Sequence, residues 1–288
     1  MSKELSNQTY TLIDSGHGKK LEKFGPYVIA RPCGQAVWNP SLSPDIWAKA
    51  NATFIRDSEN KWTTTGSLPE SWNITVSDVT FKISPTDFGH LGIFPEQKGF
   101  WEWIQKVVGQ AKSSGRNSVN VLNLFAYSGG STLAAAKGGA QVCHLDASKG
   151  MVSWARENAV LSGLGDAPIR WIVDDVSKFL AREVKRGVRY DGIILDPPSF
   201  GRGSRGEVFK IEDDLQKILK DCVSLLSDHP LFVLFTCHSP GFSPIVMDHL
   251  MKQTMAKYKG TVDCGEMVLS GEGLPLPSGV YARWHSGK

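Results

Sequence analysis

From residue 119 onward, short apolar runs alternate with segments whose apolar residues recur at helical spacing. The run Val119–Phe125 is almost continuously apolar, and Lys149–Ser162 has apolar positions three and four residues apart. Near-continuous apolar runs are typical of parallel strands that helices cover on both faces. The pattern predicts an α/β fold with a doubly wound, mostly parallel seven-stranded sheet. Its strands are expected at 119–125, 141–146, 169–173, 191–196, 231–237, 261–269 and 280–285, and helices at 96–113, 131–137, 149–162, 176–186, 211–226 and 244–257.

The two ends of the chain break this alternation. The last two predicted strands are joined by a loop rather than a helix, which favours an antiparallel terminal hairpin. Between about residues 20 and 95, β-branched and aromatic residues are interrupted by Pro, Gly, Asn and Ser, as in small β-rich domains. We therefore expect an N-terminal β-rich domain over 1–95, suited to substrate recognition, and a larger domain over 96–288. Residues 1–18 are polar and are expected to be loose.

Composition narrows the class of protein only modestly. The chain is 41% hydrophobic and 21% charged, as expected of a globular protein, and no apolar run approaches the length that a membrane span needs. Its five cysteines are scattered without CxxC pairs, so neither a metal site nor disulfides are indicated, and a cytoplasmic location is expected. A net charge of +3 is compatible with a nucleic-acid partner without requiring one.

The segment after the first predicted strand has the composition of a ligand-binding loop. Ala126-Tyr127-Ser128-Gly129-Gly130 lies between that strand and a helix of small residues. In Rossmann-like sheets, ligands bind beyond the carboxyl ends of the strands, where glycines allow close approach and helix N-termini offer free N–H groups. The GxGxxG pattern of nicotinamide enzymes is absent, which disfavours an oxidoreductase.

Carboxylates follow the next three predicted strands. Asp146 ends the second strand, where such a residue accepts both hydroxyls of a ribose, and Asp174-Asp175 ends the third. Asp196-Pro197-Pro198-Ser199-Phe200 ends the fourth. An aspartate at one strand end is more often a turn former or a helix cap. Polar groups at four successive strand ends indicate a nucleoside-type ligand.

These segments resemble the class I S-adenosylmethionine-dependent methyltransferases over about residues 88–285. Within that class the chain looks closest to the ribosomal RNA large-subunit methyltransferase group that includes cytosine-5 enzymes. The likeness is carried by FGHLGIFPEQKGFWEWI, NLFAYSGGST, LDASKGMVSWARENA, DDVSKFL, DPPSFGRGSRGEVFKIEDDL and TCHSPGFSP.

The resemblance implies S-adenosyl-L-methionine as cofactor and a set of residues that hold it. Ala126–Gly129 would hold the methionine end, Asp146 the ribose, and Asp175 the adenine amine. The stretch His90–Gln97 would close over the cofactor from the N-terminal side. The implied cofactor residues are His90, Leu91, Gly92, Phe94, Gln97, Asn123, Phe125, Ala126, Tyr127, Ser128, Gly129, Asp146, Ala147, Ser148, Asp175, Val176 and Asp196.

Two motifs indicate different methyl acceptors. Asp196 to Phe200 resembles the loop with which amino-methylating enzymes hold a planar nitrogen, with rigid prolines and an aromatic ring for stacking. Thr236-Cys237-His238-Ser239 instead places Cys237 where related cytosine-5 enzymes keep the thiolate that adds to the base. In that case Asp196 would bind the base or transfer a proton. A cysteine at the end of an apolar strand is otherwise usually a core residue.

Basic and aromatic residues suggest where a nucleic acid would bind. Arg202 and Arg205 lie in the glycine-rich segment that follows Phe200, where they would hold phosphates. The basic residues around helix 176–186 are read as a solvated face. In the N-terminal domain, candidates for stacking are Trp38, Trp47, Trp62 and Trp72.

The preferred hypothesis is methylation of ribosomal RNA at cytosine C5, with Cys237 and Asp196 as catalytic residues and Pro197, Pro198, Ser199, Phe200, Arg202 and Arg205 as substrate-binding residues. The alternative is methylation of an amino group on a base or other planar nitrogen. A non-catalytic module that only binds the cofactor is a third hypothesis, and the intact set of strand-end residues disfavours it.

Overall fold

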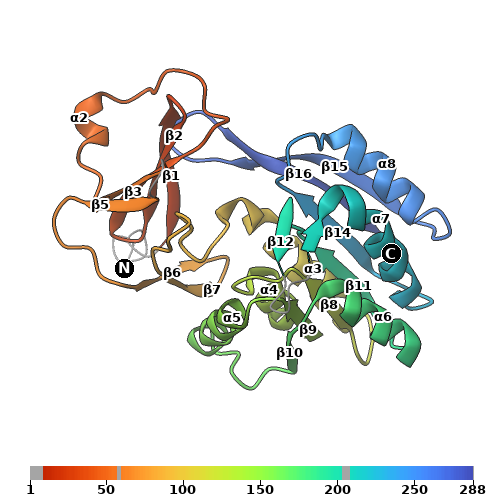
Figure 1. The fold of residues 1–288 in the computed structure, drawn as a ribbon. Coiled ribbons are helices and arrows are strands. Elements are labelled where there is room, and N and C mark those ends of the chain that lie inside the picture. Colours follow the sequence, from red (N-terminus) through yellow and green to blue (C-terminus); the bar gives the residue numbers. More distant parts are fainter. Residues whose placement is uncertain (1–8, 57–59, 203–207, 288) are drawn as a thin grey trace. The chain divides into compact units, whose positions relative to one another are not determined.

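The computed structural model describes residues 9–56, 60–202 and 208–287, and the chain divides into two compact units (Figure 1). The first unit comprises residues 1–98 and Val268–Ser278, and the second comprises Gly99–Met267 and Gly279–Lys288. The first unit thus includes a segment that the sequence pattern places in the larger domain. Within the described ranges, no helix combines the length and the apolar character that crossing a bilayer requires.

The first unit is built on a five-stranded sheet with the order β1-β2-β3-β4-β5. Neighbouring strands are antiparallel, except for β3 and β4, which pair in parallel. A separate two-stranded sheet is formed by β6 and β7. The elements of this unit are β1 (Tyr10–Gly16), β2 (Lys19–Phe24), β3 (Tyr27–Pro32), α2 (Pro44–Trp47), β4 (Ala52–Ile55), β5 (Lys61–Thr64), β6 (Trp72–Val76), β7 (Val79–Ile83) and the 3-10 turn η1 (Pro95–Gln97).

Strand β1 occupies part of the segment that was expected to be loose, and that expectation is wrong for residues 10–16. Leu12, Asp14 and Ser15 are all buried in β1, so the strand hides polar as well as apolar side chains. The turn into β2 has positive φ at His17 (49°) and Gly18 (73°). Two successive residues of this kind match the right-handed twist of a tight antiparallel hairpin.

Asp14 explains why a polar residue is buried in β1. Its carboxylate accepts hydrogen bonds from three backbone N–H groups and one indole. The donors are Ser15 N (2.9 Å), Ser41 N (3.2 Å), Leu42 N (2.9 Å) and Trp47 Nε1 (3.0 Å). A buried carboxylate with this number of donors is stable in place of an apolar residue and fixes the loop that leads to α2.

The four tryptophans considered for a nucleic-acid surface belong to the hydrogen-bond framework of the first unit. All four are half-buried, and each indole N–H donates to an acceptor within the same unit. The pairs are Trp38 to Ser15 O (2.9 Å), Trp47 to Asp14 Oδ2 (3.0 Å), Trp62 to Thr86 O (2.8 Å) and Trp72 to Phe24 O (2.9 Å).

The second unit contains a seven-stranded sheet with the order β10-β9-β8-β11-β14-β16-β15. The first five strands in this order pair in parallel, and β16 runs antiparallel to β14. The predicted doubly wound sheet with a terminal hairpin is therefore confirmed. Its elements are α3 (Lys98–Ser113), β8 (Asn120–Leu124), α4 (Gly130–Lys137), β9 (Gln141–Asp146), α5 (Lys149–Leu161), β10 (Ile169–Val173), α6 (Val176–Arg186), β11 (Gly192–Leu195), β12 (Phe200–Arg202), β13 (Val208–Lys210), α7 (Ile211–Leu225), β14 (Phe232–Cys237), α8 (Pro244–Thr254), β15 (Thr261–Leu269) and β16 (Leu276–His285).

One core cluster of the second unit combines residues of the sheet with residues of α6, α7 and α8, and helices α3, α4 and α5 bury further apolar side chains. Every residue of the central strands β11 and β14 is buried, whereas the edge strand β10 is partly exposed along its whole length. Because the central strands are more buried than the edge strand, we expect β8, β11 and β14 to be the most rigid part of the sheet. Loops that follow those strands therefore start from fixed positions.

Candidate active site

The loop after β8 has backbone angles that most residue types rarely adopt. Positive φ angles occur at Phe125 (55°), Tyr127 (49°) and Gly129 (91°). Non-glycine residues rarely adopt this region, and clusters of such outliers are typical of binding sites. A Cβ on Gly129 would lie 3.0 Å from the Ala155 Cβ of α5, so the glycine is also needed for close packing.

Asp146, at the end of β9, holds this loop in place. Its carboxylate accepts from the Tyr127 N–H (2.9 Å) and from the Ser148 N–H (2.8 Å). Burial raises the pKa of Asp146 above its ordinary value, although the two backbone donors oppose the shift. The loop after β8 and the start of α5 are thus joined through one half-buried carboxylate.

A buried polar network lies beneath the loop. Asn123 Nδ2 donates to Thr132 Oγ1 (2.9 Å), and that hydroxyl is 2.9 Å from His144 Nδ1. From α5, Asn158 Nδ2 donates to the backbone oxygen of Ser128 (2.9 Å). Asn123 is buried, and its side-chain amide is bonded to Thr132. The predicted contact of Asn123 with the cofactor stays a prediction.

The remaining predicted adenosine residues lie at the ends of β9 and β10. Ser148 accepts from Met151 N (3.3 Å) and caps α5, while Ala147 is half-buried beside it. Asp175 accepts from Lys178 N (2.9 Å) and caps α6, and Val176 is buried behind it. Both caps leave the first N–H groups of a helix at this edge of the sheet. Such groups are suited to polar ligand atoms.

The five predicted residues of the stretch 90–97 belong to the first unit. Leu91, Gly92 and Gln97 are buried there. His90 and Phe94 lie with their rings 5.4 Å apart and line a cavity of about 140 Å³, together with the cations Lys20, Arg31 and Arg56. Closure of this stretch over the cofactor stays a prediction.

The loop after β11 is fixed by contacts to neighbouring strands. Pro197 is buried, while Pro198 and Phe200 are exposed, Phe200 by 50%. Ser199 Oγ lies 2.7 Å from Ser239 Oγ, which follows β14. Phe200 starts strand β12, which pairs with β13 and was not among the strands predicted from the sequence. The exposed Phe200 ring therefore lies at this edge of the sheet, on a turn that is held in place.

Two further predicted substrate residues follow Phe200 in the sequence. Arg202 ends strand β12. Arg205 lies outside the described residues. Opposite, Phe209 of β13 packs against Phe125 of the loop after β8, with ring centroids 5.2 Å apart. This contact joins the DPPSF loop to the predicted cofactor loop, and neither phenylalanine stood out in this role from the sequence.

Asp196 faces a histidine from the adjacent strand. The Oδ1 atom of Asp196 lies 3.3 Å from His238 Nδ1, because β11 and β14 are parallel neighbours and both residues follow their strand ends. The two side chains are about a quarter and a third exposed. A carboxylate next to an imidazole can accept a hydrogen bond from a ligand and help to remove a proton. The sequence pattern gave no indication that these two residues form a pair.

Cys237 is a fully buried residue of the hydrophobic core, in a cluster that also contains residues of α7, α8 and β16. Its sulfur accepts from Ser239 N at 3.5 Å. Burial raises the pKa of the Cys237 thiol and Asp196 adds to this, although His238 opposes the shift. A buried thiol with a raised pKa lacks the features of an activated nucleophile. The structure gives no support to the predicted role of Cys237.

The residues present fit S-adenosylmethionine. Asp146 offers a partly desolvated carboxylate at the position for ribose hydroxyls, and the strained loop 125–129 brings backbone groups to the same edge of the sheet. The sequence pattern of the S-adenosylmethionine-dependent methyltransferases matches residues 37–261, which is most of the chain. The protein therefore belongs to this family.

Similar proteins match different fractions of this chain and of their own length. A solved structure described as the S-adenosylmethionine-dependent methyltransferase from Agrobacterium tumefaciens is 41% identical and covers 96% of this chain and 90% of its own, with a TM-score of 0.90. Ribosomal RNA large subunit methyltransferase K/L of Shewanella baltica is 34% identical over 51% of this chain and 20% of its own length. The methyltransferase K of Neisseria meningitidis is 27% identical over 67% of this chain and 51% of its own length. The chain thus spans between a fifth and about half of these two curated relatives.

Proposed function

We propose that the protein methylates an amino group, or a comparable planar nitrogen, of a base in RNA, with ribosomal RNA as the substrate class. The observation that carries this proposal is the arrangement of Asp196 and His238 beside an exposed Phe200, while the Cys237 thiol is buried. The two curated relatives, both ribosomal RNA methyltransferases by name, support the choice of substrate.

The reaction needs orientation more than covalent catalysis. When bound, S-adenosylmethionine supplies an electrophilic methyl group on its sulfonium. Phe200 would stack on the acceptor base, and the Asp196 carboxylate would accept a hydrogen bond from the amino group, which aims the nitrogen lone pair. As the N–C bond forms and the S–C bond breaks, a proton leaves the nitrogen. The Asp196–His238 pair, whose Oδ1 and Nδ1 atoms are 3.3 Å apart, would receive it.

Methylation of cytosine C5, in contrast, requires covalent catalysis by a nucleophile. Carbon 5 becomes nucleophilic only after a thiolate adds to C6, so the sulfur must be ionised and accessible. Cys237 is neither in this structure. Under the proposal its role is packing at the end of β14.

The test is methyl transfer from labelled S-adenosylmethionine to a large-subunit ribosomal RNA transcript, followed by nucleoside analysis of the product. We expect methylated amino groups and no 5-methylcytosine. Cys237→Ala should retain activity within about threefold, like the matched core variant Cys222→Ala, because both only remove a buried thiol. Asp196→Ala should lower kcat by about 10²–10³-fold, which is typical of a lost transition-state hydrogen bond.

The outcomes separate the hypotheses. Formation of 5-methylcytosine that disappears in Cys237→Ala, but not in Cys222→Ala, would establish the covalent mechanism and refute the proposal. Methyl transfer to protein or to small molecules alone would remove RNA as the substrate.

A further inference from the structure

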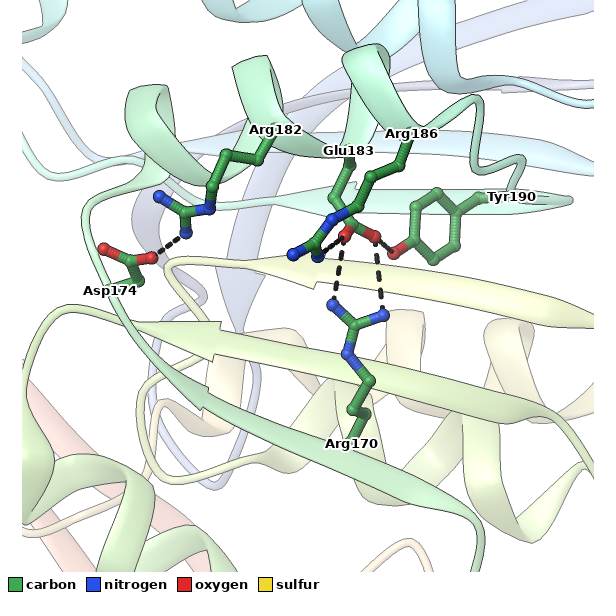
Figure 2. A network of polar contacts seen from close by, with 6 residues as sticks. All are labelled: Arg170, Asp174, Arg182, Glu183, Arg186 and Tyr190. Atoms are coloured by element: carbon green, nitrogen blue, oxygen red, sulfur yellow. Dashed lines mark hydrogen bonds and ion pairs between the residues drawn. The ribbon is translucent and has the colours of Figure 1, made fainter.

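A buried carboxylate at the edge of the second unit organises two exposed arginines. Figure 2 shows Glu183 of α6 between Arg170, from the edge strand β10, and Arg186, from the next turn of α6. Glu183 Oε1 lies 3.1 Å from Arg170 Nη2 and 3.2 Å from Arg186 Nη1, and the Tyr190 hydroxyl donates to Oε2 at 2.7 Å. Glu183 is fully buried, whereas the arginine side chains are 49% and 61% exposed.

This arrangement fixes positive charge at the surface. Burial alone would raise the pKa of Glu183, but the bonds from Tyr190, Arg170 and Arg186 lower it, so the carboxylate stays ionised at neutral pH. One carboxylate neutralises only one of the two guanidinium groups. The Arg170 guanidinium also lies 5.7 Å from the centroid of the Phe179 ring, which limits its motion. Arginines that are held in this way lose less entropy when they bind an anion.

Other cations extend the same surface. Lys178, Arg182, Lys185 and Arg186 recur at helical spacing on the exposed face of α6, and Arg189 follows the C-cap Gly187. Arg182 pairs with Asp174 (Figure 2). The segment 169–190 holds six arginines and lysines against three acidic residues, so positive charge exceeds negative charge along this surface.

We propose that the basic stripe formed by Arg170, Lys178, Arg182, Lys185, Arg186 and Arg189 binds the phosphate backbone of the RNA substrate beside the methylated nucleotide. The inference rests on the proposed function. Planar guanidinium groups suit phosphate oxygens, and a row of fixed cations suits a polyanion better than a single anion.

The position of the stripe in the sheet explains what it would contact. Strand β10 is three strands from β11, whose following loop carries Asp196. At about 4.8 Å for each neighbouring pair, the strands are about 14 Å apart across the sheet. Arg170 is in register with Ile193, three residues before Asp196, which adds about 10 Å along the strand. The separation corresponds to a few nucleotides. The stripe would therefore hold flanking RNA and not the acceptor base. Its loss should weaken binding and raise KM while kcat stays nearly constant.

The experiment measures the Kd of the full chain for a large-subunit ribosomal RNA transcript between 0.05 and 0.3 M salt, as roughly the range in which counterion release is resolved. Two double variants remove charges from the stripe. The first is Arg170→Gln with Arg186→Gln. The second is Lys185→Gln with Arg189→Gln, and it leaves the Glu183 network intact. Lys257→Gln with Lys259→Gln is the matched control, because these exposed lysines follow α8, away from β10 in the sheet order. S-adenosylmethionine binding verifies that each variant is folded.

We expect each stripe variant to raise Kd at least about fivefold at 0.1 M salt and to reduce the slope of log Kd against log salt by about 1 to 2, since each lost phosphate contact removes about 0.7–0.9. The control should match the wild type. Equal Kd values for the stripe variants, the control and the wild type would overturn the stripe but leave the proposed function standing. Absence of salt-dependent RNA binding by the wild type would overturn both.

Discussion

Asp146 has two roles that depend on one ionised carboxylate. It accepts the N–H groups of Tyr127 and Ser148, and so shapes the site before any ligand arrives. It is also the residue that we predict to bind the ribose hydroxyls. Charge-assisted hydrogen bonds contribute about 1.5–3 kcal/mol each, so the carboxylate should dominate the affinity for the adenosine part of the cofactor.

Replacing Asp146 by alanine should therefore weaken S-adenosylmethionine binding by about 100-fold or more, because two such bonds are worth at least ~3 kcal/mol. The pH dependence has a defined sign. Since burial raises the pKa of Asp146, the carboxylate is protonated at a higher pH than an exposed aspartate, and wild-type affinity falls as the pH drops through that raised value. Calorimetry between pH 7.5 and 5 measures both effects, with Asp166→Ala in an exposed turn as control. Unchanged affinity in Asp146→Ala would refute the assignment.

Two neighbouring residues at the end of β14 show which features of the site can be predicted from the sequence. The sequence predicts that Cys237 and His238 both end the fifth parallel strand, next to the loop that contains Asp196. Successive side chains of a strand point to opposite faces, so only one of the two can reach that loop. Which one does is decided by packing against α7 and α8, because the buried face takes the thiol. That information is tertiary and does not appear in the local pattern.

At the scale of elements, the cofactor loop depends on how closely α3 and α4 approach. A Cβ on Gly130 would lie 2.6 Å from the Trp101 ring, and one on Gly138 would lie 2.8 Å from the Val108 Cβ. The small residues of α4 are therefore a consequence of packing as well as of ligand binding. Helix α4 starts directly after Gly129, so α3 sets the position of the loop.

We expect Gly130→Ala to destabilise the protein by about 1–3 kcal/mol, the usual cost of overpacking, because the Trp101 ring is buried and has little room to move. Gly109→Ala, within α3, is the matched control. Among the described residues, no atom outside that helix lies within 4 Å of the methyl group that this alanine would add, so the substitution should stabilise by about 0.5–1 kcal/mol. Urea denaturation measures both changes. Equal effects of the two substitutions would show that contact with Trp101 does not control this packing.

Elements were predictable where burial and hydrophobicity coincide. Strands such as β11 and β14 are apolar and entirely buried, so their positions and their parallel pairing follow from pattern alone. Strand β1 was not predicted because Asp14 and Ser15 are buried polar residues, and long-range donors satisfy the Asp14 carboxylate. The segment Val268–Ser278 was assigned by its place in the chain, whereas Leu269 and Leu276 pack with Leu12 of the first unit. Contacts between distant segments leave no periodic signal.

At the scale of the whole molecule, both units contain buried ion pairs and histidines with depressed pKa values. Burial and nearby cations lower the pKa of His90, in the first unit, to about 4, and burial lowers that of His144, in the second, to about 3. The bonds of Glu22 with Arg31, and of Glu183 with Arg170, lower the carboxylate pKa values despite burial. The carboxylates stabilise the fold above about pH 4.5, and this stabilisation is lost at lower pH. The histidines affect stability in a higher pH range.

Stability should begin to fall below about pH 6.5. The unfolded chain binds a proton at each histidine near pH 6.5, whereas folded His144 resists it down to about pH 3, so acid favours unfolding throughout that interval. For His144 the loss between pH 6.5 and pH 5 is about 2 kcal/mol. Urea denaturation at pH 7.5, 6, 5.5 and 5 measures it, as roughly the steps over which this linkage develops. His144→Gln should flatten the decline whatever its stability at pH 7.5, while His249→Gln, on the exposed face of α8, should leave it unchanged. An equally steep decline in His144→Gln would mean that this histidine is not the neutral, buried group that holds Thr132 beneath the cofactor loop.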